Sequence, residues 1–382
     1  MKICDVVLNS VWHDPRVTKQ VEQYVKYGAS VTCVGMTDKR LNEKKIAQYP
    51  CPVVLVDRDA VYGGKQRSIV KKLIREFSRI RSIRDAVVAQ APELIHANDL
   101  DALIPSYLAS RKLKCKLVYD AHEINCDTRY YDKYRLYAQA MRMIERYIVK
   151  RCDLMVCVSN AAADHYVSEY HITRPMVVTN CISQDNVIRE EVRKHEGFEI
   201  LNHGMYRDAR GFELMVESCD YLKDYPDIVL AARGLGPLEE SLRKGAAQKE
   251  TKNFVFYPPA DPRDMIREAA CSHVGVAITL PICLNYIMSI SNRLFEYAAA
   301  GLPVIMSDIP EHRYLNDRYE IGIVIKENTP EAFAEAAVRL YQDREFYESC
   351  RRNAAVMSNE INWENEFRKL YDAECACLGC ER

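Results

Sequence analysis

The chain of 382 residues lacks a long hydrophobic run, since no apolar stretch approaches the ~20 residues that a membrane-spanning helix needs. Residues 1–5 lead straight into an apolar segment and lack the charged start, apolar core and cleavage site of a signal peptide. Low-complexity tracts and internal repeats are also absent, which disfavours solenoids and propellers. These absences predict a globular protein of the cytoplasm.

The sequence also offers little for a metal ion. Its 15 cysteines are scattered, and the chain is large enough to fold without disulfides, so we expect reduced thiols. Cys375, Cys377 and Cys380 form a cluster, but three thiols at a chain end lack the fourth ligand of a structural zinc site. We therefore predict no metal site.

The formal net charge of −1 conceals a difference between the two halves of the chain. Residues 1–182 carry 29 Lys and Arg against 20 Asp and Glu, whereas the remainder carries 24 against 34. A basic first half can approach phosphates or anionic lipid headgroups, and the net charge of an acidic second half would repel them.

Short apolar segments alternate with helical patterns along the whole chain, which is typical of parallel, doubly wound sheets. In the first half we expect strands at 2–8, 30–34, 53–56, 94–96, 116–119, 154–158 and 176–178. In the second half we expect them at 199–203, 228–232, 254–256, 274–278, 304–306 and 323–325. Helices are expected between most of them, at 17–28, 66–90, 100–112, 133–151, 160–170 and 211–222.

A chain of this length exceeds the size at which a single hydrophobic core keeps growing. The polar segment 183–197 is the best candidate linker. We therefore expect an α/β protein of two Rossmann-like domains, 1–182 and 198–360, whose parallel sheets face each other across a ligand-binding cleft. Residues 361–382 would form a C-terminal helix and tail that could pack back on the first domain.

The segment 292–305 sets a polar helix start against a buried strand. We expect a helix from Asn292 to Gly301, because Pro303 stops its continuation before the strand 304–306. Glu296 then lies one turn into this helix, beside unpaired backbone N–H groups that favour an anion. Sugar hydroxyls and a phosphate could share this corner; the alternative is an ordinary helix-to-strand turn.

Two loops that follow strands in the second half could contact a ligand. In the loop 204–211, Arg210 could grip a phosphate with its planar fork of donors, and the helix after Gly211 adds amide donors. In the loop 232–237, missing side chains would let a flat or anionic ligand approach the backbone. An exposed arginine at a turn is the alternative for Arg210.

Together these motifs resemble the nucleotide-binding domain of GT-B glycosyltransferases, specifically the retaining enzymes of family 4 (group 1 type). The order and spacing of the motifs carry the likeness. The resemblance implies that Glu296 holds the ribose hydroxyls of a nucleotide-sugar. It further implies diphosphate or sugar contacts at Arg210, Asn292, Arg293, Gly204, Gly234 and Gly236.

The first half resembles the acceptor domain of the same family through the segments 14–17, 94–99 and 119–123. The resemblance implies that His122 faces the donor sugar, where a neutral imidazole can hydrogen-bond a hydroxyl. A structural histidine is the alternative, and His96 fits that alternative better. Asp120 and Glu123 could orient His122 or cap a helix, and the sequence leaves both readings open.

The chain departs from the family pattern at two places. Met288 stands eight positions before Glu296, where the family often has an acidic residue, so the sugar contacts must differ locally. The loop 9–14 lacks the paired glycines that many members present to the diphosphate. His13 and Arg16 could substitute for them.

The chemistry implied by the resemblance is transfer of a sugar, with retention, from a UDP- or GDP-sugar to a hydroxyl of a glycan or lipid-linked acceptor. This would serve bacterial surface polysaccharide synthesis. Arg210, Arg293 and helix amides could stabilise the leaving phosphate by preorganised charge, so we expect neither a metal nor another cofactor. We assign no protein nucleophile.

Two other functions stay open. A non-hydrolysing nucleotide-sugar epimerase has a similar two-domain fold. A catalytically silent sugar-nucleotide-binding protein is the second alternative, because Met288 and the loop 9–14 depart from the family pattern.

Two basic stretches of the first half could reach a membrane. Residues 65–84 combine eight basic residues and one acid with apolar residues at helical spacing, which are Ile69, Leu73, Ile74, Phe77 and Ile80. The stretch 129–151 adds Tyr130, Tyr131, Tyr134 and Tyr137, a residue type suited to the bilayer interface. We expect the basic half to dock on the inner leaflet; the alternative is a solvated basic face. Nucleic-acid binding is not expected, because no nucleic-acid module accompanies the charge.

Overall fold

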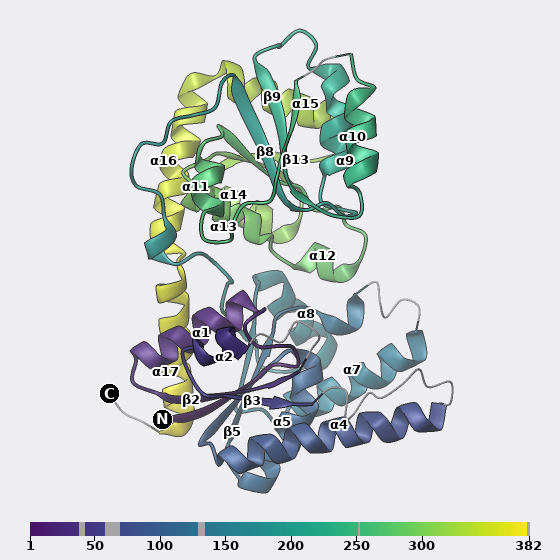
Figure 1. Cartoon of the computed structure of the whole chain (residues 1–382), viewed down its shortest axis with the longest axis vertical. Coiled ribbons are helices and arrows are strands. Elements are labelled where there is room, and N and C mark those ends of the chain that lie inside the picture. Colours follow the sequence, from purple (N-terminus) through teal and green to yellow (C-terminus); the bar gives the residue numbers. More distant parts are fainter. Residues whose placement is uncertain (38–42, 58–68, 129–133, 251–252, 380–382) are drawn as a thin grey trace. The chain divides into compact units, whose positions relative to one another are not determined.

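The computed structural model describes residues 1–37, 43–57, 69–128, 134–250 and 253–379, with the backbone alone at 69–73. Two units make up the chain. The first consists of Met1–Thr179 together with the chain from Glu366 onward, and the second consists of Asn180–Asn365. Each unit holds one parallel sheet with helices around it (Figure 1).

The sheet of the first unit has seven strands in the order β3-β2-β1-β4-β5-β6-β7. These strands are β1 (Lys2–Val6), β2 (Ser30–Met36), β3 (Val53–Val56), β4 (Leu94–Asn98), β5 (Lys116–Ala121), β6 (Leu154–Cys157) and β7 (Met176–Val177). The helices are α1 (Pro15–Lys26), α2 (Glu43–Ala47), α4 (Ile69–Gln90), α5 (Asp99–Leu113), α7 (Arg135–Val149), α8 (Asn160–Tyr170) and most of α17 (Trp363–Leu378).

The sheet of the second unit has six strands in the order β10-β9-β8-β11-β12-β13. These strands are β8 (Phe198–Met205), β9 (Ile228–Leu235), β10 (Phe254–Tyr257), β11 (Val274–Ala277), β12 (Val304–Ser307) and β13 (Gly322–Ile325). The helices are α9 (Phe212–Ser218), α10 (Glu239–Ala247), α11 (Met265–Ala270), α12 (Leu284–Met288), α13 (Asn292–Ala299), α14 (Pro310–Tyr319), α15 (Pro330–Gln342) and α16 (Arg344–Glu360).

The prediction of two α/β domains with parallel sheets is confirmed, and every expected strand segment forms a strand. Helix boundaries are less accurate. The expected helix 17–28 begins earlier, at Pro15, because the side chain of Asp14 accepts hydrogen bonds from the first backbone N–H groups. The expected helix 211–222 is α9 followed by a short 3₁₀ turn, Cys219–Tyr221. The first residues of the expected helix 66–90 lie outside the described part of the chain.

In each sheet the strand order reverses at one point. The chain moves outward from β1 through β2 to β3 and then returns to β4 on the other side of β1, and it does the same around β8 and β11. Open α/β sheets bind ligands outside the carboxyl ends of the strands at such points. The candidate ligand sites are therefore the ends of β1 and β4 and the ends of β8 and β11.

No helix in the described ranges is both long and apolar enough to cross a bilayer. Within the same ranges, no group of three His, Cys, Asp or Glu residues is placed to hold a metal ion. Of the predicted cysteine cluster, Cys375 is buried and Cys377 half-buried on α17, and Cys380 lies outside the described residues.

Candidate active site

Helix α13 is held against strand β11 by a close contact between Gly275 and Tyr297. A Cβ atom on Gly275 would lie 2.1 Å from the Tyr297 ring, so only glycine lets the helix approach the strand this closely. The Tyr297 hydroxyl in turn accepts the backbone N–H of His203 at 3.0 Å. This packing fixes the position of Glu296, the neighbour of Tyr297, at the ends of β8 and β11.

The carboxylate of Glu296 pairs with His203 of strand β8. Nε2 of His203 donates to Oε2 of Glu296 at 2.7 Å, and the two side chains are 2% and 14% exposed, respectively. Burial raises the pKa of Glu296, but the hydrogen bond from His203 and the charges of His203 and of two arginines outweigh it and lower the pKa. The second oxygen, Oε1, has no hydrogen-bond partner among the described residues, so it can accept hydrogen bonds from a ligand.

Arg210 carries a positive charge that no carboxylate of the described residues pairs with directly. Its guanidinium makes no hydrogen bond or ion pair with any residue in the described ranges, and it lies beside Gly204, where a Cβ atom would be 3.2 Å from Nη1. Burial and the nearby charge of Arg207 lower the pKa of Arg210, while Glu296 raises it. A bound anion would therefore relieve an unfavourable placement of charge.

Arg293 has a different role from the one that the sequence suggested. Its guanidinium is 5% exposed and donates to Asn202 Oδ1 and to the backbone oxygens of Arg210, Val276 and Ile278. Burial lowers its pKa to about 10. Because these donors are already used, Arg293 ties the loop of Arg210 to the end of β11 and does not present its fork to a phosphate.

The glycines of the loop 232–237 are required by packing of the chain on itself. A Cβ atom on Gly234 would lie 2.0 Å from the backbone oxygen of Gly204, and one on Gly236 would lie 2.4 Å from the backbone oxygen of Tyr206. The space that we expected to admit a ligand is thus filled by the end of strand β8 and by Tyr206. Gly234 and Gly236 let the end of β9 lie close against the end of β8, where Gly204 pairs with Gly234.

Asn292 and Met288 complete this corner of the second unit. Asn292 is exposed at the start of α13, and Met288 is half-buried at the end of the short helix α12.

Gly204 has a backbone φ of +123°, which favours glycine. A substitution at Gly204 would thus strain the chain beside Arg210.

In the first unit, Arg16 and Asp120 form a buried ion pair. Nη2 of Arg16 lies 2.8 Å from Oδ2 of Asp120, with exposed fractions of 3% and 0%, and Nη1 donates to the backbone oxygen of Val178. Burial raises the pKa of Asp120, but Arg16 and His122 outweigh it and hold the pKa well below its usual range. The suggestion that Arg16 replaces the phosphate-binding glycines is wrong, because its donors are used inside the domain. His13 is exposed.

His122 lies at the end of β5, within contact distance of three side chains. Nε2 donates to Asn98 Oδ1 at 3.2 Å and lies 3.4 Å from Asp120 Oδ2, while the backbone N–H donates to Asp99. Burial lowers the pKa of His122, but Asp99 and Asp120 outweigh it and raise the pKa. The ring therefore keeps its proton to a higher pH than an ordinary histidine, whereas we had expected the neutral form. Glu123 is exposed, and of the two acids only Asp120 contacts the ring.

His96 is a structural residue. It is fully buried, and its Nδ1 donates to Glu374 of helix α17 at 2.8 Å. Glu374 also accepts from the hydroxyl of Tyr24, and Asp120 lies 3.6 Å from the other side of the His96 ring. Burial lowers the pKa of His96, but the two carboxylates outweigh it and raise the pKa to about 10.

His203 and Asp99 are the site residues that sequence reasoning missed. His203 lies in an expected strand, and the signal was a polar pair, Asn202 and His203, at the carboxyl end of a buried strand. Asp99 follows strand β4 with a positive φ of +65°, rare for a residue other than glycine, and it contacts both His122 and Asn125. No sequence pattern reveals that strain.

Comparison with known proteins identifies the family. The profile described as Glycosyltransferase Family 4 matches residues 17–186, and the profile described as Glycosyl transferases group 1 matches residues 183–357. The chain belongs to the group 1 glycosyltransferases of family 4. The GT-B fold that the sequence predicted is confirmed with it.

Individual relatives of this GT-B protein are distant. It is 29% identical to the D-rhamnosyltransferase WbpZ of Pseudomonas aeruginosa over 171 residues, which cover 44% of this chain and 40% of that protein. The fold matches the sucrose-phosphate synthase of Thermosynechococcus elongatus with a TM-score of 0.77 and 13% identity over the whole of both chains. It also matches Anabaena Alr3699/HepE in complex with UDP, with a TM-score of 0.75 and 14% identity over 98% of this chain and all of the other. At these identities the structural likeness shows the fold alone.

Proposed function

We propose that this chain transfers a sugar from a nucleoside diphosphate to a hydroxyl group. The observation that carries the proposal is a pair of groups at the ends of β8 and β11. The guanidinium of Arg210 and the Oε1 atom of the ionised Glu296 both lack a hydrogen-bond partner among the described residues. A diphosphate needs a cation, and a ribose needs an acceptor for its hydroxyls. The site offers both on one short stretch of surface in the same unit.

The reaction needs only charge stabilisation and orientation from the protein. The bond between the sugar carbon and the diphosphate oxygen breaks, and its electron pair stays on the diphosphate, where Arg210 stabilises the developing charge. The acceptor oxygen bonds to the same face of the sugar, and its proton passes to the leaving phosphate. This retaining path requires neither a protein nucleophile nor a metal ion.

The comparisons support the class of reaction and leave the substrates as proposals. The name of the Pseudomonas relative supports transfer of a hexose-type sugar. The UDP in the Anabaena structure supports a nucleoside diphosphate as the leaving group. We propose a UDP- or GDP-sugar as donor and a glycan or lipid-linked glycan of the bacterial surface as acceptor, with the transfer taking place at the cytoplasmic face of the membrane.

Replacing Glu296 with alanine should weaken binding of UDP or GDP about ten- to a hundredfold. The reason is the loss of hydrogen bonds between ribose hydroxyls and a charged group, each worth about 1.5–3 kcal/mol. Titration calorimetry with both nucleotides measures the effect. The exposed Glu335 of α15, changed to alanine, is the matched control and should bind as the wild type does. Unchanged affinity in the Glu296 variant would mean that the donor site lies elsewhere.

Replacing His122 with alanine should slow transfer about tenfold or more while nucleotide affinity stays within about twofold, because the lost hydrogen bond goes to the sugar. Since the pKa of His122 is raised, the wild-type rate should fall as the pH rises through that pKa, and the variant should lack this fall. The half-buried His165 of α8, changed to alanine, is the control. Equal loss of nucleotide affinity and rate would remove His122 from the sugar site.

A donor screen with product analysis by mass spectrometry separates the alternative functions. When only a UDP- or GDP-sugar is supplied and no acceptor is present, an epimerase converts the donor into its isomer. A transferase produces no such isomer. A silent binding protein would bind the nucleotide, with affinity depending on Glu296, and yield no product with any acceptor.

A further inference from the structure

The outward face of helix α7 is apolar, although nothing in the described part of the protein covers it. We name as the α7 face the exposed side chains Leu136, Met143, Ile144 and Tyr147, whose exposed fractions run from 39% to 83%. The inward face of the same helix is apolar as well, with Ala138, Met141 and Ile148 buried. A helix that is apolar on two sides requires a second partner.

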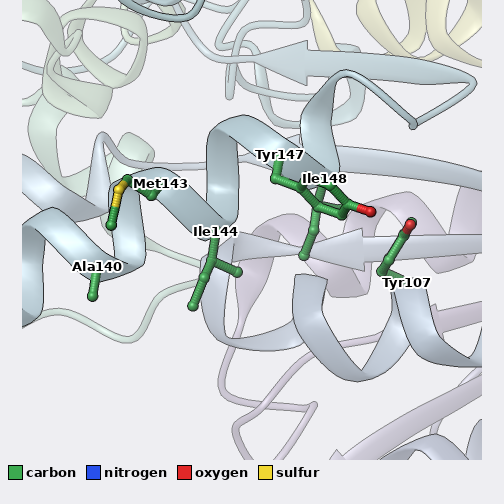
Figure 2. A pocket seen from close by; sticks show the side chains of 6 residues that line it. All are labelled: Tyr107, Ala140, Met143, Ile144, Tyr147 and Ile148. Atoms are coloured by element: carbon green, nitrogen blue, oxygen red, sulfur yellow. The ribbon is translucent and has the colours of Figure 1, made fainter.

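A hollow deepens this surface beside helix α5. It has a volume of about 480 Å³ and is lined by Tyr107 of α5 together with Ala140, Met143, Ile144, Tyr147 and Ile148 of α7 (Figure 2). The rings of Tyr107 and Tyr147 meet edge to face, with their centroids 6.3 Å apart. Tyrosine is a side chain with an apolar body and a polar tip, which suits the boundary between lipid and water.

The exposed charge of α7 is entirely positive. Arg135 and Arg146 are exposed, and Lys150 and Arg151 follow directly at the end of the helix. The one acid of the helix, Glu145, is 1% exposed and accepts hydrogen bonds from the hydroxyls of Tyr119 and Tyr170 in the interior. The α7 face therefore presents apolar and cationic groups together and no exposed carboxylate of its own.

Helices α5 and α4 also carry exposed cationic or apolar side chains. Helix α5 packs against both α7 and α4, and its end carries the exposed cations Arg111 and Lys112. On α4, Ile74 and Phe77 are 63% and 72% exposed. The other predicted side chains of that stretch, Lys65, Arg67, Ile69, Lys71, Lys72 and Leu73, lie outside the described side chains, as do Arg129, Tyr130 and Tyr131 before α7.

We propose that the α7 face docks on the surface of an anionic membrane, with its apolar side chains at the level of the headgroups and its cations against the lipid phosphates. A second copy of the chain fits less well. A symmetric contact through α7 would place the arginines of one copy against those of the other, without a carboxylate on this face to pair with them. The further consequence that the acceptor is lipid-linked rests on the proposed sugar transfer; the docking itself does not.

Sedimentation with lipid vesicles tests the docking without any sugar. The wild type should pellet with vesicles of equal parts phosphatidylcholine and phosphatidylglycerol at low salt, and much less with phosphatidylcholine alone or at about 0.5 M salt, where charges are screened. Met143→Glu should weaken binding about tenfold or more. Arg146→Glu should weaken it about fivefold for each unit of charge removed.

Val356→Glu supplies the matched control, since Val356 is an exposed apolar residue of α16 in the second unit and is 49% exposed. It should pellet as the wild type does, and all three variants should bind UDP or GDP with wild-type affinity.

Equal recovery of the wild type with neutral and anionic vesicles at low salt would overturn the proposal. So would equal effects of Met143→Glu and Val356→Glu. A wild-type dimer that Met143→Glu converts to a monomer, without vesicle binding, would assign the face to a second copy instead. If the wild type bound neither UDP nor GDP, this result would count against the proposed function, and the vesicle result would still test the docking.

Discussion

Replacing Arg210 with methionine should slow sugar transfer about a hundred- to a thousandfold, which is the loss typical when one preorganised charge-stabilising group is removed from a transition state. Methionine fills similar space without the charge. The expectation follows from the half-buried guanidinium beside Gly204, which has no partner among the described residues and whose pKa is lowered by burial and by Arg207. Turnover at saturating donor is the quantity to measure.

The effect of Arg210 should lie mainly in turnover, because charge on the diphosphate grows as the sugar leaves. The exposed Arg263 of the same unit, changed to methionine, should retain wild-type turnover, since its charge is already paired with Asp261 in solvent. A variant at Arg210 that keeps its turnover and loses only donor affinity would show that the guanidinium holds the ground state and contributes nothing further at the transition state.

Replacing Glu374 with glutamine should lower the free energy of unfolding by about 3–5 kcal/mol, because it removes the hydrogen-bonded carboxylate of a buried charge pair with His96. Both side chains have exposed fractions of 0%. Urea unfolding followed by circular dichroism of the full chain measures the change, with the first unit expected to unfold earlier than the second.

The same pair should also determine how stability depends on pH. The pKa of His96 is raised in the folded protein from 6.5 to about 10. The stabilisation from the protonated ring is therefore fully present below pH 6.5 and is lost as the pH rises toward about 10. Glu374→Gln should flatten this slope. The exposed Asp372 of the same helix, changed to asparagine, should alter stability by no more than about 0.5 kcal/mol. An unchanged slope in the Glu374 variant would show that Asp5 and Asp120 alone hold the proton on His96.

The fold was predictable because its signals are local. Each buried strand is a short apolar run, as in 304–306, bounded by residues such as Gly301 and Pro303 that end helices and turn the chain. Parallel strands must alternate with crossover segments, so the order of runs and helices along the chain leaves few topologies. Helix ends were less accurate because capping by a side chain, as by Asp14, moves a boundary by a residue or two.

Sequence reasoning could single out candidate residues from local signals: Arg210 lies in the loop between β8 and α9, and Glu296 lies one turn into α13. Their roles in binding stay predictions. Arg16 was misassigned because its partner Asp120 is 104 residues away, and no spacing encodes a pairing that only the folded sheet creates. Arg293 was misassigned for the same reason, since its acceptors are backbone oxygens of other segments.

The outward face of α7 shows another limit of prediction from the sequence. Sequence periodicity identifies apolar stripes but does not say which stripe faces the core, and α7 has two of them. The decisive observation was the burial of Glu145 among tyrosine hydroxyls, which turns the remaining apolar side chains outward.

Helix α17 makes the order of synthesis matter for this protein. Its later part, from Glu366, belongs to the first unit, where Glu374 reaches His96 and Tyr24. A ribosome delivers these residues only after the whole second unit, so the domain that emerges first lacks the carboxylate partner of its buried histidine until then. The second unit consists of Asn180–Asn365 and so contains only the first residues of α17. A nonsense mutation between Asn365 and Glu374 would therefore damage the first unit more than the second.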